Sequence, residues 1–270
     1  MDENILVLRD VCKTFPGVKA LDHVDFDVKK GEVLALAGEN GAGKSTLMKI
    51  LSGSYTRDCG TIEFCGKPAE IHNPRDAERL GLSIIYQELN VLQGLSVAEN
   101  IFIGRQPKKK NGLVDWAKMN KDAEELFQQL HIEMDVRRKV LGMSIAQQQM
   151  VEIVKAISYN SKILVMDEPT SSISDKEVAF LFKTMRSLTS KGVGIIYISH
   201  KMSELEEICD RVTVMRDGEY VGTEVVKNTT KDALIAMMVG RELTNYYTRD
   251  FEEHEEVIMR CEGISDGELA

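Results

Sequence analysis

One glycine-rich segment of the sequence has the residues needed to bind phosphate. Residues 38–45 read Gly-Glu-Asn-Gly-Ala-Gly-Lys-Ser, which matches G-x-x-x-x-G-K-[ST] at every fixed position. The glycines let the backbone curl so that successive N–H groups point at phosphate oxygens, and the helix expected to start near Lys44 adds its positive end. Lys44 would supply a full charge to the β- and γ-phosphates, and the Ser45 hydroxyl suits Mg²⁺. The residues expected at the phosphates are Gly38, Glu39, Asn40, Gly41, Ala42, Gly43, Lys44, Ser45 and Thr46.

Two carboxylates follow an apolar segment further along the chain. Residues 163–166 are Ile-Leu-Val-Met, and Asp167 and Glu168 come directly after them. We expect Asp167 to reach Mg²⁺ through water. Glu168 would point to the other side of the strand end, where it can polarise a water for in-line attack on the γ-phosphate. An apolar strand that ends in Asp-Glu is a weak signal alone, but together with the phosphate loop it predicts nucleotide hydrolysis.

Short apolar runs that alternate with helical patterns must position these groups. Residues 33–37 form a continuous apolar run, as expected of a strand buried on both faces. Such alternation predicts an α/β domain with a mostly parallel central sheet and a β-rich patch near the N-terminus. Further strands are expected at residues 5–8, 24–28, 60–64, 83–86, 163–166, 194–198 and 211–215, and helices at residues 47–51, 176–188 and 203–209.

The middle of the chain has a different pattern. Strands are hard to find between residues 90 and 158, whereas Met119, Ala123, Phe127 and Leu130 recur at helical spacing. Residues 147–157 show the same periodicity. We therefore expect a helical subdomain over residues 90–158, inserted into an α/β core made of residues 1–89 and 159–240.

The composition excludes several classes of protein. The chain has 270 residues, of which 43% are hydrophobic and 29% charged, as in an ordinary globular protein. Its net charge of −9 argues against nucleic acid as the main partner. No apolar run approaches the ~18 residues of a membrane-spanning helix, and the acidic N-terminus does not resemble a signal peptide. The five cysteines are scattered without metal-ligand spacing, which predicts buried thiols in the cytoplasm.

Together these motifs resemble the nucleotide-binding domain of ATP-binding cassette (ABC) transporters, from residue 5 to about residue 241. The resemblance implies an α/β fold: a P-loop NTPase core with a mostly parallel sheet, an N-terminal antiparallel β patch and an inserted helical subdomain. It implies that Phe15 stacks on adenine, that Gln87 contacts Mg²⁺ and the attacking water, and that His200 reaches the γ-phosphate. Phe15 also fits a core aromatic and His200 a strand-end histidine, but their order along the chain favours the functional interpretation.

The same resemblance completes the expected site. Ser144 and Gln147, within residues 143–149, resemble the signature segment that contacts the ATP of a second cassette. The catalytic residues implied are Glu168, His200 and Gln87, and the metal ligands implied are Ser45, Gln87 and Asp167.

Two positions depart from the usual pattern of the family. The usual signature is Leu-Ser-Gly-Gly-Gln, and here Ile145 and Ala146 replace both glycines. Ser144 and the helix N-terminus remain to meet phosphate, although side chains make a close approach of the backbone less easy. Ser174 stands where the loop after the acid pair usually has aspartate. Both departures resemble the carbohydrate-importer branch, and residues 15–21 and 232–242 look like its ribose and galactose or methyl-galactoside importers.

The resemblance also implies how such a chain works. Two cassettes form a head-to-tail sandwich, and ATP lies between the phosphate loop of one and the signature segment of the other. The chain would be a Mg²⁺-dependent ATP hydrolase, bound peripherally at the cytoplasmic face of the cell membrane. It would power import of a monosaccharide through separate integral membrane permease subunits, indirectly served by a periplasmic or extracellular sugar-binding protein, with no nucleic acid partner.

Two other functions are compatible with a phosphate loop. One is a soluble cassette that acts as a switch on ribosomes or in repair, and the acidic charge and residues 232–242 speak against it. The other is a P-loop kinase, against which the segment 143–149 and His200 argue.

The last residues suggest a longer protein. After the nucleotide-binding domain of residues 1–240, residues 241–256 read as a linker with an acidic run. Residues 258–264 echo the apolar spacing of residues 5–11, so we expect residues 257–270 to begin a second, truncated cassette. We also expect residues 244–270 to add little to the stability of the first 240 residues.

Overall fold

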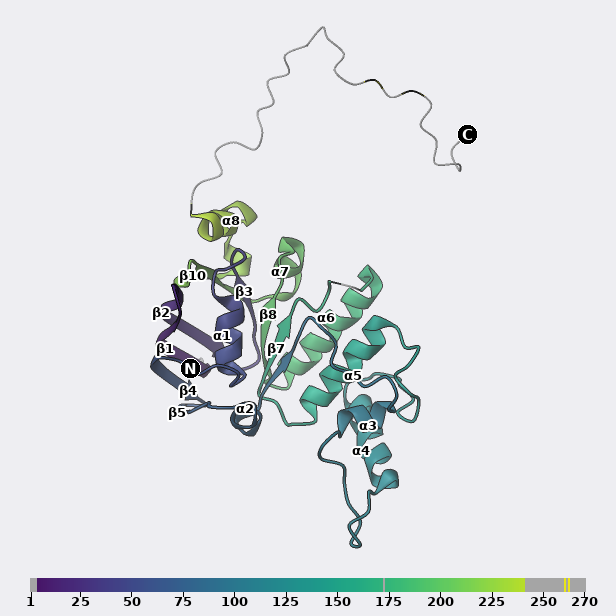
Figure 1. Cartoon of the computed structure of the whole chain (residues 1–270). Coiled ribbons are helices and arrows are strands. Elements are labelled where there is room, and N and C mark those ends of the chain that lie inside the picture. Colours follow the sequence, from purple (N-terminus) through teal and green to yellow (C-terminus); the bar gives the residue numbers. More distant parts are fainter. Residues whose placement is uncertain (1–3, 172, 241–259, 261, 263–270) are drawn as a thin grey trace.

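Two β-sheets form the centre of the computed structural model, which describes residues 4–171, 173–240, 260 and 262 (Figure 1). The larger sheet has six strands in the order β10-β9-β3-β8-β7-β6, and all neighbours are parallel except β9 and β10. The fold class expected from the sequence is thereby confirmed. The strands of this sheet are β3 (Val33–Ala37), β6 (Leu82–Ile85), β7 (Ile163–Asp167), β8 (Gly194–Ile198), β9 (Arg211–Arg216) and β10 (Glu219–Val225).

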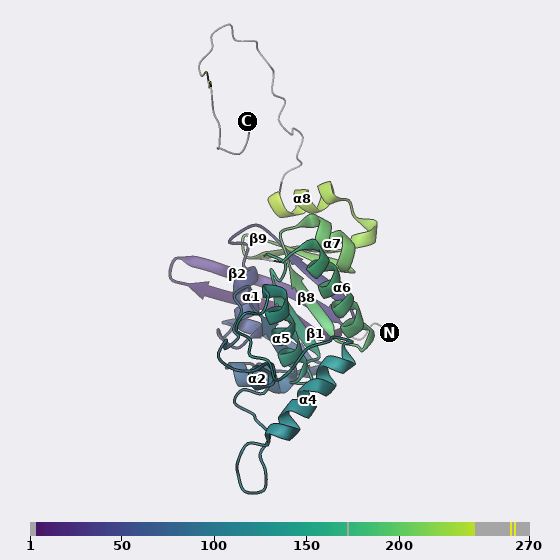
Figure 2. The ribbon, with the colours of Figure 1, turned by 90° about the vertical axis from the view of Figure 1, so that its right-hand side faces the viewer.

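The smaller sheet is antiparallel and is built mostly from the N-terminal residues. Its order is β2-β1-β4-β5, and the hairpin of β1 and β2 extends away from the body of the molecule (Figure 2). Both hairpin strands are longer than the periodicity predicted, because their added parts mix a few buried residues, such as Val11 and Leu21, with exposed ones and show no regular alternation. The bounds are β1 (Asn4–Phe15), β2 (Val18–Lys29), β4 (Cys59–Phe64) and β5 (Lys67–Pro68).

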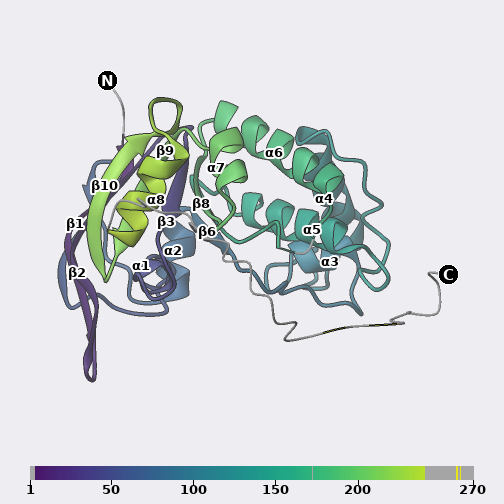
Figure 3. The ribbon, with the colours of Figure 1, turned by 90° about the horizontal axis from the view of Figure 1, so that it is seen from above.

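The helices divide between two sides of the molecule (Figure 3). Helices α1 and α2 lie on the side of the antiparallel sheet, and α3 to α6 lie on the other side. Helices α3, α4 and α5 follow one another along the chain between β6 and β7. The bounds are α1 (Lys44–Leu51), α2 (Pro74–Leu80), α3 (Val97–Ile101), α4 (Trp116–Gln129), α5 (Ile145–Ile157), α6 (Asp175–Ser190), α7 (Met202–Ile208) and α8 (Lys231–Val239), with a short 3₁₀ helix at Val226–Asn228.

Two apolar cores cover the two faces of the larger sheet. On β3, Leu34 and Leu36 pack into the core shared with α1 and the antiparallel sheet, whereas Ala35 and Ala37 face the core shared with α5 and α6. This alternation is the period of a strand. Burying one leucine side chain such as Leu34 stabilises the fold by about 1.5–3 kcal/mol. The sheet is therefore held firmly from both sides, and the loops at its carboxyl edge start from fixed points.

Helix α2 and strand β10 were not predicted. Helix α2 is bounded by ordinary signals: Asn73 accepts hydrogen bonds from the first turn, Pro74 is the first helical residue, and Gly81 ends the helix with φ 89°. Only Ala77 of this helix is buried, so it shows no apolar periodicity. Strand β10 is an edge strand without buried residues, and its sequence gives no apolar run for the same reason.

The expectation of scattered, buried thiols is wrong for three of the cysteines. Cys12 of β1 and Cys59 of β4 lie opposite each other and form a disulfide, with their Cα atoms 5.0 Å apart. Cys65 is exposed and Cys209 is buried, while Cys261 lies outside the described residues. His23 Nδ1 is 3.6 Å from Cys12 Sγ, but sulfurs that are bonded to each other are not thiolate ligands. Strand pairing joins positions 47 residues apart, which sequence spacing does not reveal.

Three further expectations concern the linker, the start of a second cassette and the lack of a membrane-spanning helix. The linker at 241–256 lies outside the described residues, and so do nearly all of residues 257–270. Over the ranges 4–171 and 173–240, no helix has both the length and the apolar character to span a bilayer.

Candidate active site

The phosphate loop lies between the buried strand β3 and the first turn of α1. Two of its glycines are required by close approach of other backbone segments. A Cβ at Gly43, where φ is 98°, would lie 2.7 Å from the carbonyl oxygen of Ala20, and a Cβ at Gly38 would lie 2.3 Å from that of Met215. Both distances are shorter than any real Cβ contact, so side chains at these positions would displace the loop.

Lys44 is the first residue of α1 and crosses back over the loop. Its Nζ donates hydrogen bonds to the carbonyl oxygens of Gly38, at 2.7 Å, and Glu39, at 2.9 Å. Burial lowers the pKa of Lys44 below its ordinary value, while the charges of Glu168 and Asp167 act to raise it. A half-buried cation thus stands at the positive end of a helix whose first turn, Lys-Ser-Thr-Leu, contains no carboxylate.

One cavity of 540 Å³ gathers most of the expected nucleotide and metal residues. It opens between the phosphate loop, the carboxyl end of β7 and the first residues of β2. The phosphate loop and the end of β7 meet here because β3 and β7 both flank β8 in the sheet. Its lining includes Val18, Lys19, Ala20, Asn40, Gly41, Ala42, Gly43, Lys44, Ser45, Thr46, Gln87, Asp167 and Glu168.

The two carboxylates at the end of β7 differ in their surroundings. Burial, followed by the charge of Glu168, raises the pKa of Asp167, and Lys44 opposes this rise. Asp167 is therefore a partly buried carboxylate with a second carboxylate next to it and one cation, Lys44, acting on both. A hydroxyl from Ser45, an amide from Gln87 and the Asp167 carboxylate line the same cavity. These are hard oxygen donors of the kind that Mg²⁺ prefers, so the residues present fit a magnesium ion.

Glu168 and His200 meet above the ends of two adjacent strands. His200 Nδ1 lies 3.2 Å from Glu168 Oε1, and the imidazole is 68% exposed. Glu168 has a left-handed backbone, with φ 46°, and its N–H donates to the carbonyl oxygen of Ile198 at 2.9 Å. The loops after β7 and β8 thus carry a carboxylate and an imidazole in contact, beside the phosphate loop.

Gly38, Glu39 and His200 contact residues of this cavity without lining it, whereas Phe15, Ser144 and Gln147 lie away from it. Phe15 is half-buried and packs edge-on against Tyr55, with ring centroids 5.3 Å apart, and it does not line the cavity. Ser144 and Gln147 lie at the start of α5 and line a different hollow of 390 Å³ that includes Phe180. Within one copy of the chain, Ser144 and Gln147 therefore do not reach the cavity of the phosphate loop.

A smaller hollow of 290 Å³ adjoins the first cavity. It shares Gln87 and Glu168 with that cavity and is also lined by Ile145 and Gln149 of α5. The loop after β6 thus lies against both the carboxylate site and the first turns of α5.

Sequence reasoning missed Glu204, a buried carboxylate behind the site. It lies on α7, is 6% exposed, and accepts hydrogen bonds from Thr170 and Ser199 in the loops after β7 and β8. A signal for it was present in the sequence. Glu204 precedes Leu205 and shares a helix face with Ile208, both of which are buried. A carboxylate on an apolar helix face needs polar partners inside the protein.

Comparison with known proteins places the chain in a family. Residues 21–171 match the family model described as ABC transporter. A relative from Burkholderia cenocepacia, whose name gives ribose/galactose/methyl galactoside import, is 52% identical over 265 residues, covering 97% of this chain and 52% of that protein. The galactose/methyl galactoside import ATP-binding protein of Pasteurella multocida is 48% identical over 263 residues, with the same two coverages. The chain spans about half the length of the curated relatives that it matches.

Solved structures agree with this assignment. The ADP conformation of an ATP-binding cassette of an ABC transporter superposes with a TM-score of 0.77 at 27% identity, covering 88% of this chain and 99% of that one. A nucleotide-free cassette from an ABC transporter gives a TM-score of 0.76 at 26% identity, covering 87% and 98%. The chain belongs to the ABC transporter family, as one of its ATP-binding cassettes.

Proposed function

We propose that this chain binds and hydrolyses ATP with Mg²⁺ and so powers the import of a monosaccharide through separate membrane subunits. The observation that carries the proposal is the single cavity in which Lys44, Asp167 and Glu168 meet. The names of the relatives, which give import of ribose, galactose and methyl galactoside, support a monosaccharide as the cargo. The same names do not favour a soluble switch on ribosomes or in repair. The chain would work at the cytoplasmic face of the membrane.

The phosphate loop would hold the triphosphate. Backbone N–H groups of residues 38–45 and the start of α1 would meet phosphate oxygens, and Lys44 would exchange its two carbonyl partners for the β- and γ-phosphates. Ser45, Gln87 and Asp167 would hold Mg²⁺, which when bound neutralises phosphate charge. Phe15 would stack on adenine from the tip of the β1–β2 hairpin.

Glu168 and His200 would act on the attacking water. The carboxylate of Glu168 would take a proton from the water as its oxygen bonds to the γ-phosphorus, while the bond from that phosphorus to the ADP oxygen breaks. His200, 3.2 Å from Glu168, would hold the γ-phosphate and the water in line. The contact between Glu168 and His200 supports this division of roles.

A second cassette would complete the site. The Ser144 hydroxyl and the start of α5 would approach the ATP held by another cassette, and the second helix N-terminus would share the phosphate charge. Relatives about twice as long support the proposal that residues 257–270 begin that second cassette, after a linker at 241–256. The domain division proposed is residues 1–240, with a helical subdomain at 90–158.

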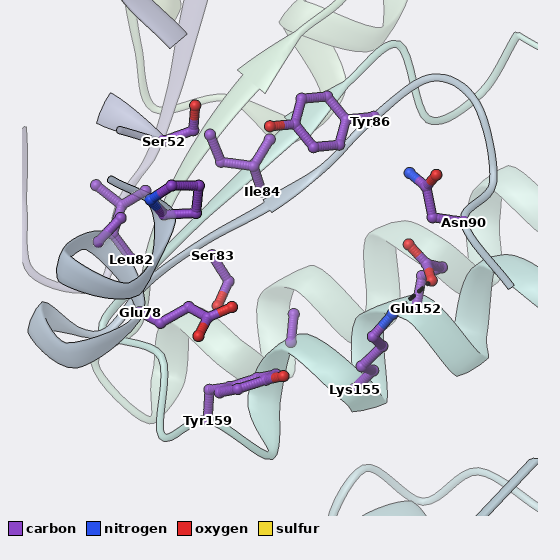
Figure 4. Close-up of a pocket in the computed structure, with 13 residues that line it drawn as sticks. Ser52, Glu78, Leu82, Ser83, Ile84, Tyr86, Asn90, Glu152, Lys155 and Tyr159 are labelled. Carbon is purple, nitrogen blue, oxygen red and sulfur yellow. Dashed lines mark ion pairs between the residues drawn. The ribbon is translucent and has the colours of Figure 1, made fainter. Parts of the chain in front are cut away.

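The membrane subunits would dock beside Gln87. A groove of 230 Å³ lies between α2, β6 and α5, and Figure 4 shows Tyr86 facing Glu152, Lys155 and Tyr159 across it. Tyr86 is 40% exposed and directly precedes Gln87. A membrane-subunit segment seated here would move the loop that also lines the nucleotide cavity, which couples transport to hydrolysis.

Co-purification tests the proposal. The chain would be expressed with the membrane subunits encoded beside it, in its natural full length, and captured from detergent-solubilised membranes. We expect a complex whose ATP hydrolysis rises when a monosaccharide and its binding protein are supplied. Recovery without membrane subunits, together with no sugar dependence of hydrolysis, would contradict the proposal.

A further inference from the structure

Glu204 of α7 is an internal carboxylate with an unusual number of donors. Its Oε2 accepts three hydrogen bonds, each of 2.8 Å, from Thr170 Oγ1, Tyr197 Oη and Ser199 Oγ. Its Oε1 lies 3.1 Å from Lys201 Nζ. The side chain is 8% exposed, so these contacts replace water almost completely.

The donors come from the two loops that carry the reacting groups. Thr170 lies two residues after Glu168, and Ser199 directly precedes His200. The lysine that pairs with Glu204 also donates from Nζ to the carbonyl oxygen of Thr170, at 3.3 Å. One carboxylate therefore joins the loop after β7 to the loop after β8, directly behind the contact of Glu168 with His200.

Glu204 is ionised in this setting. Burial acts to raise the pKa of Glu204, but the hydrogen bonds from Tyr197, Ser199, Thr170 and Lys201 together hold it below its usual value. An ionised carboxylate only accepts hydrogen bonds, so each of the three hydroxyls must donate to it. Their orientation is thereby fixed, and charge-assisted hydrogen bonds of this kind are stronger than neutral ones.

The backbone next to this network is strained. Glu168 has φ 46°, a left-handed conformation that a residue with a side chain adopts at a cost. Such a conformation persists only where the surrounding contacts over-determine it. The hydrogen bonds that Thr170 and Ser199 donate to Glu204, together with the bond from the Glu168 N–H to the carbonyl oxygen of Ile198, supply those contacts.

We infer that Glu204 is a positioning residue for hydrolysis. It holds the loops after β7 and β8 together so that the Glu168 carboxylate and the His200 imidazole stay in contact. Glu204 itself does not line the nucleotide cavity. The inference rests on the proposed ATPase function, but the contact between Glu168 and His200 that it explains can be measured on the purified chain apart from hydrolysis.

The kinetic test uses variants of one helix. Glu204→Gln would be compared in the assembled membrane complex with Glu206→Gln and Glu207→Gln, which remove the same charge from exposed positions on α7. We expect Glu204→Gln to lower kcat about tenfold or more, because small displacements of reacting groups are costly. Its KM for ATP should stay within about twofold of the parent, since the phosphate loop is untouched. A raised KM with unchanged kcat, or a kcat like that of Glu206→Gln, would overturn the inference.

A second readout needs no hydrolysis. Nuclear magnetic resonance of the purified chain, labelled at histidine, would follow the His200 ring in the parent, in Glu168→Gln and in Glu204→Gln. Loss of the Glu168 contact in Glu204→Gln should move the His200 ring signals in the direction seen for Glu168→Gln, and Glu206→Gln should leave them in place. Unmoved His200 signals in Glu204→Gln would overturn the inference whatever the kinetics show.

Two milder variants guard against misfolding. Ser199→Ala and Thr170→Val each remove one donor and keep the carboxylate, so each should move the His200 signals by a smaller amount than Glu204→Gln. These two variants replace Glu204→Gln in the test if that variant does not fold. Folded variants with unmoved signals would also overturn the inference. A parent complex that hydrolyses no ATP would refute the proposed function, and the resonance measurement would still decide the role of Glu204.

Discussion

The N-termini of helices α1 and α5 are both expected to meet phosphate, and they are prepared for it in opposite ways. Helix α1 follows Gly43 and has no side-chain cap, so its first N–H groups remain free for an anion. Helix α5 begins with a capping box: the Gln147 N–H donates to Ser144 Oγ at 3.2 Å, and the Ser144 N–H donates to Gln147 Oε1 at 3.1 Å. Of the two helix ends in the proposed composite site, only that of α1 is therefore free to bind an anion within a single chain.

The two ends also differ in what surrounds them. The phosphate loop lies in a cavity with Gln87, Asp167 and Glu168, whereas Ser144 is exposed and Ile145 is 46% exposed. An exposed large apolar side chain beside an exposed cap is consistent with a surface that another cassette covers. The signature half would gain its ligand only when two cassettes meet.

The largest effect should come from Glu168, which lines the cavity of the phosphate loop at the end of α1. Glu168→Gln keeps the shape of the side chain but loses the carboxylate that polarises water, so turnover in the assembled complex should fall by about 10²–10⁴. ATP affinity should stay near that of the parent. Rates of phosphate release would be measured at saturating ATP, and turnover within about threefold of the parent would sink the assignment of Glu168.

Lys44→Ala should change binding instead of chemistry. Removing a cation that contacts phosphate should cost about 1.5–3 kcal/mol, which corresponds to about a 10- to 150-fold weaker ATP affinity. Calorimetry on the purified chain would measure this directly. Lys49→Ala, at the other end of α1, serves as the matched control. Equal ATP affinity in the parent and in Lys44→Ala would contradict the claim that Lys44 and the start of α1 bind ATP within a single chain.

His200→Ala should have an intermediate effect. The imidazole is expected to position the γ-phosphate and water, so kcat should fall about tenfold while ATP affinity changes little. His72→Ala, on an exposed loop far along the chain, provides a control for loss of a histidine. Hydrolysis at the parent rate in the assembled complex would refute a positioning role for His200.

Ser144→Ala should have the smallest effect on the isolated chain. Loss of the cap of α5 should lower the free energy of unfolding by about 1 kcal/mol, or about 2–4 °C in Tm for a chain of this size. ATP affinity of the isolated chain should not change, because Ser144 does not line the cavity. Scanning calorimetry and titration would measure both, and weaker ATP binding by the lone variant would contradict the comparison.

Much of the cavity around the phosphate loop could be predicted from the sequence. The phosphate loop is a local pattern of glycines, and β3 and β7 are apolar runs, so Lys44 and Asp167 were located from neighbouring residues alone. The order of strands in the sheet brings these two residues together. A parallel sheet of this kind is what the alternation of strands and helices predicts.

The contacts that were missed depend on distant parts of the chain. The face of α7 that carries Glu204 can be read from the sequence, but its partner Thr170 lies 34 residues away and cannot. The packing of Phe15 in β1 on Tyr55, in the loop after α1, leaves no local pattern either. The pairing of Cys12 with Cys59 follows from strand register, which a one-residue slip would reverse. Sequence patterns describe which face a residue occupies but not which distant side chain it meets there.

Association of the chain tests the composite site most directly. Sedimentation of Glu168→Gln would be followed with Mg²⁺ and ATP, with ADP, and without nucleotide, and Ser144→Ala would be added to the same variant as a control. We predict one chain without nucleotide or with ADP, two chains with ATP, and weaker pairing when Ser144 is replaced. A single chain at every concentration, while calorimetry shows ATP to be bound, would contradict the account.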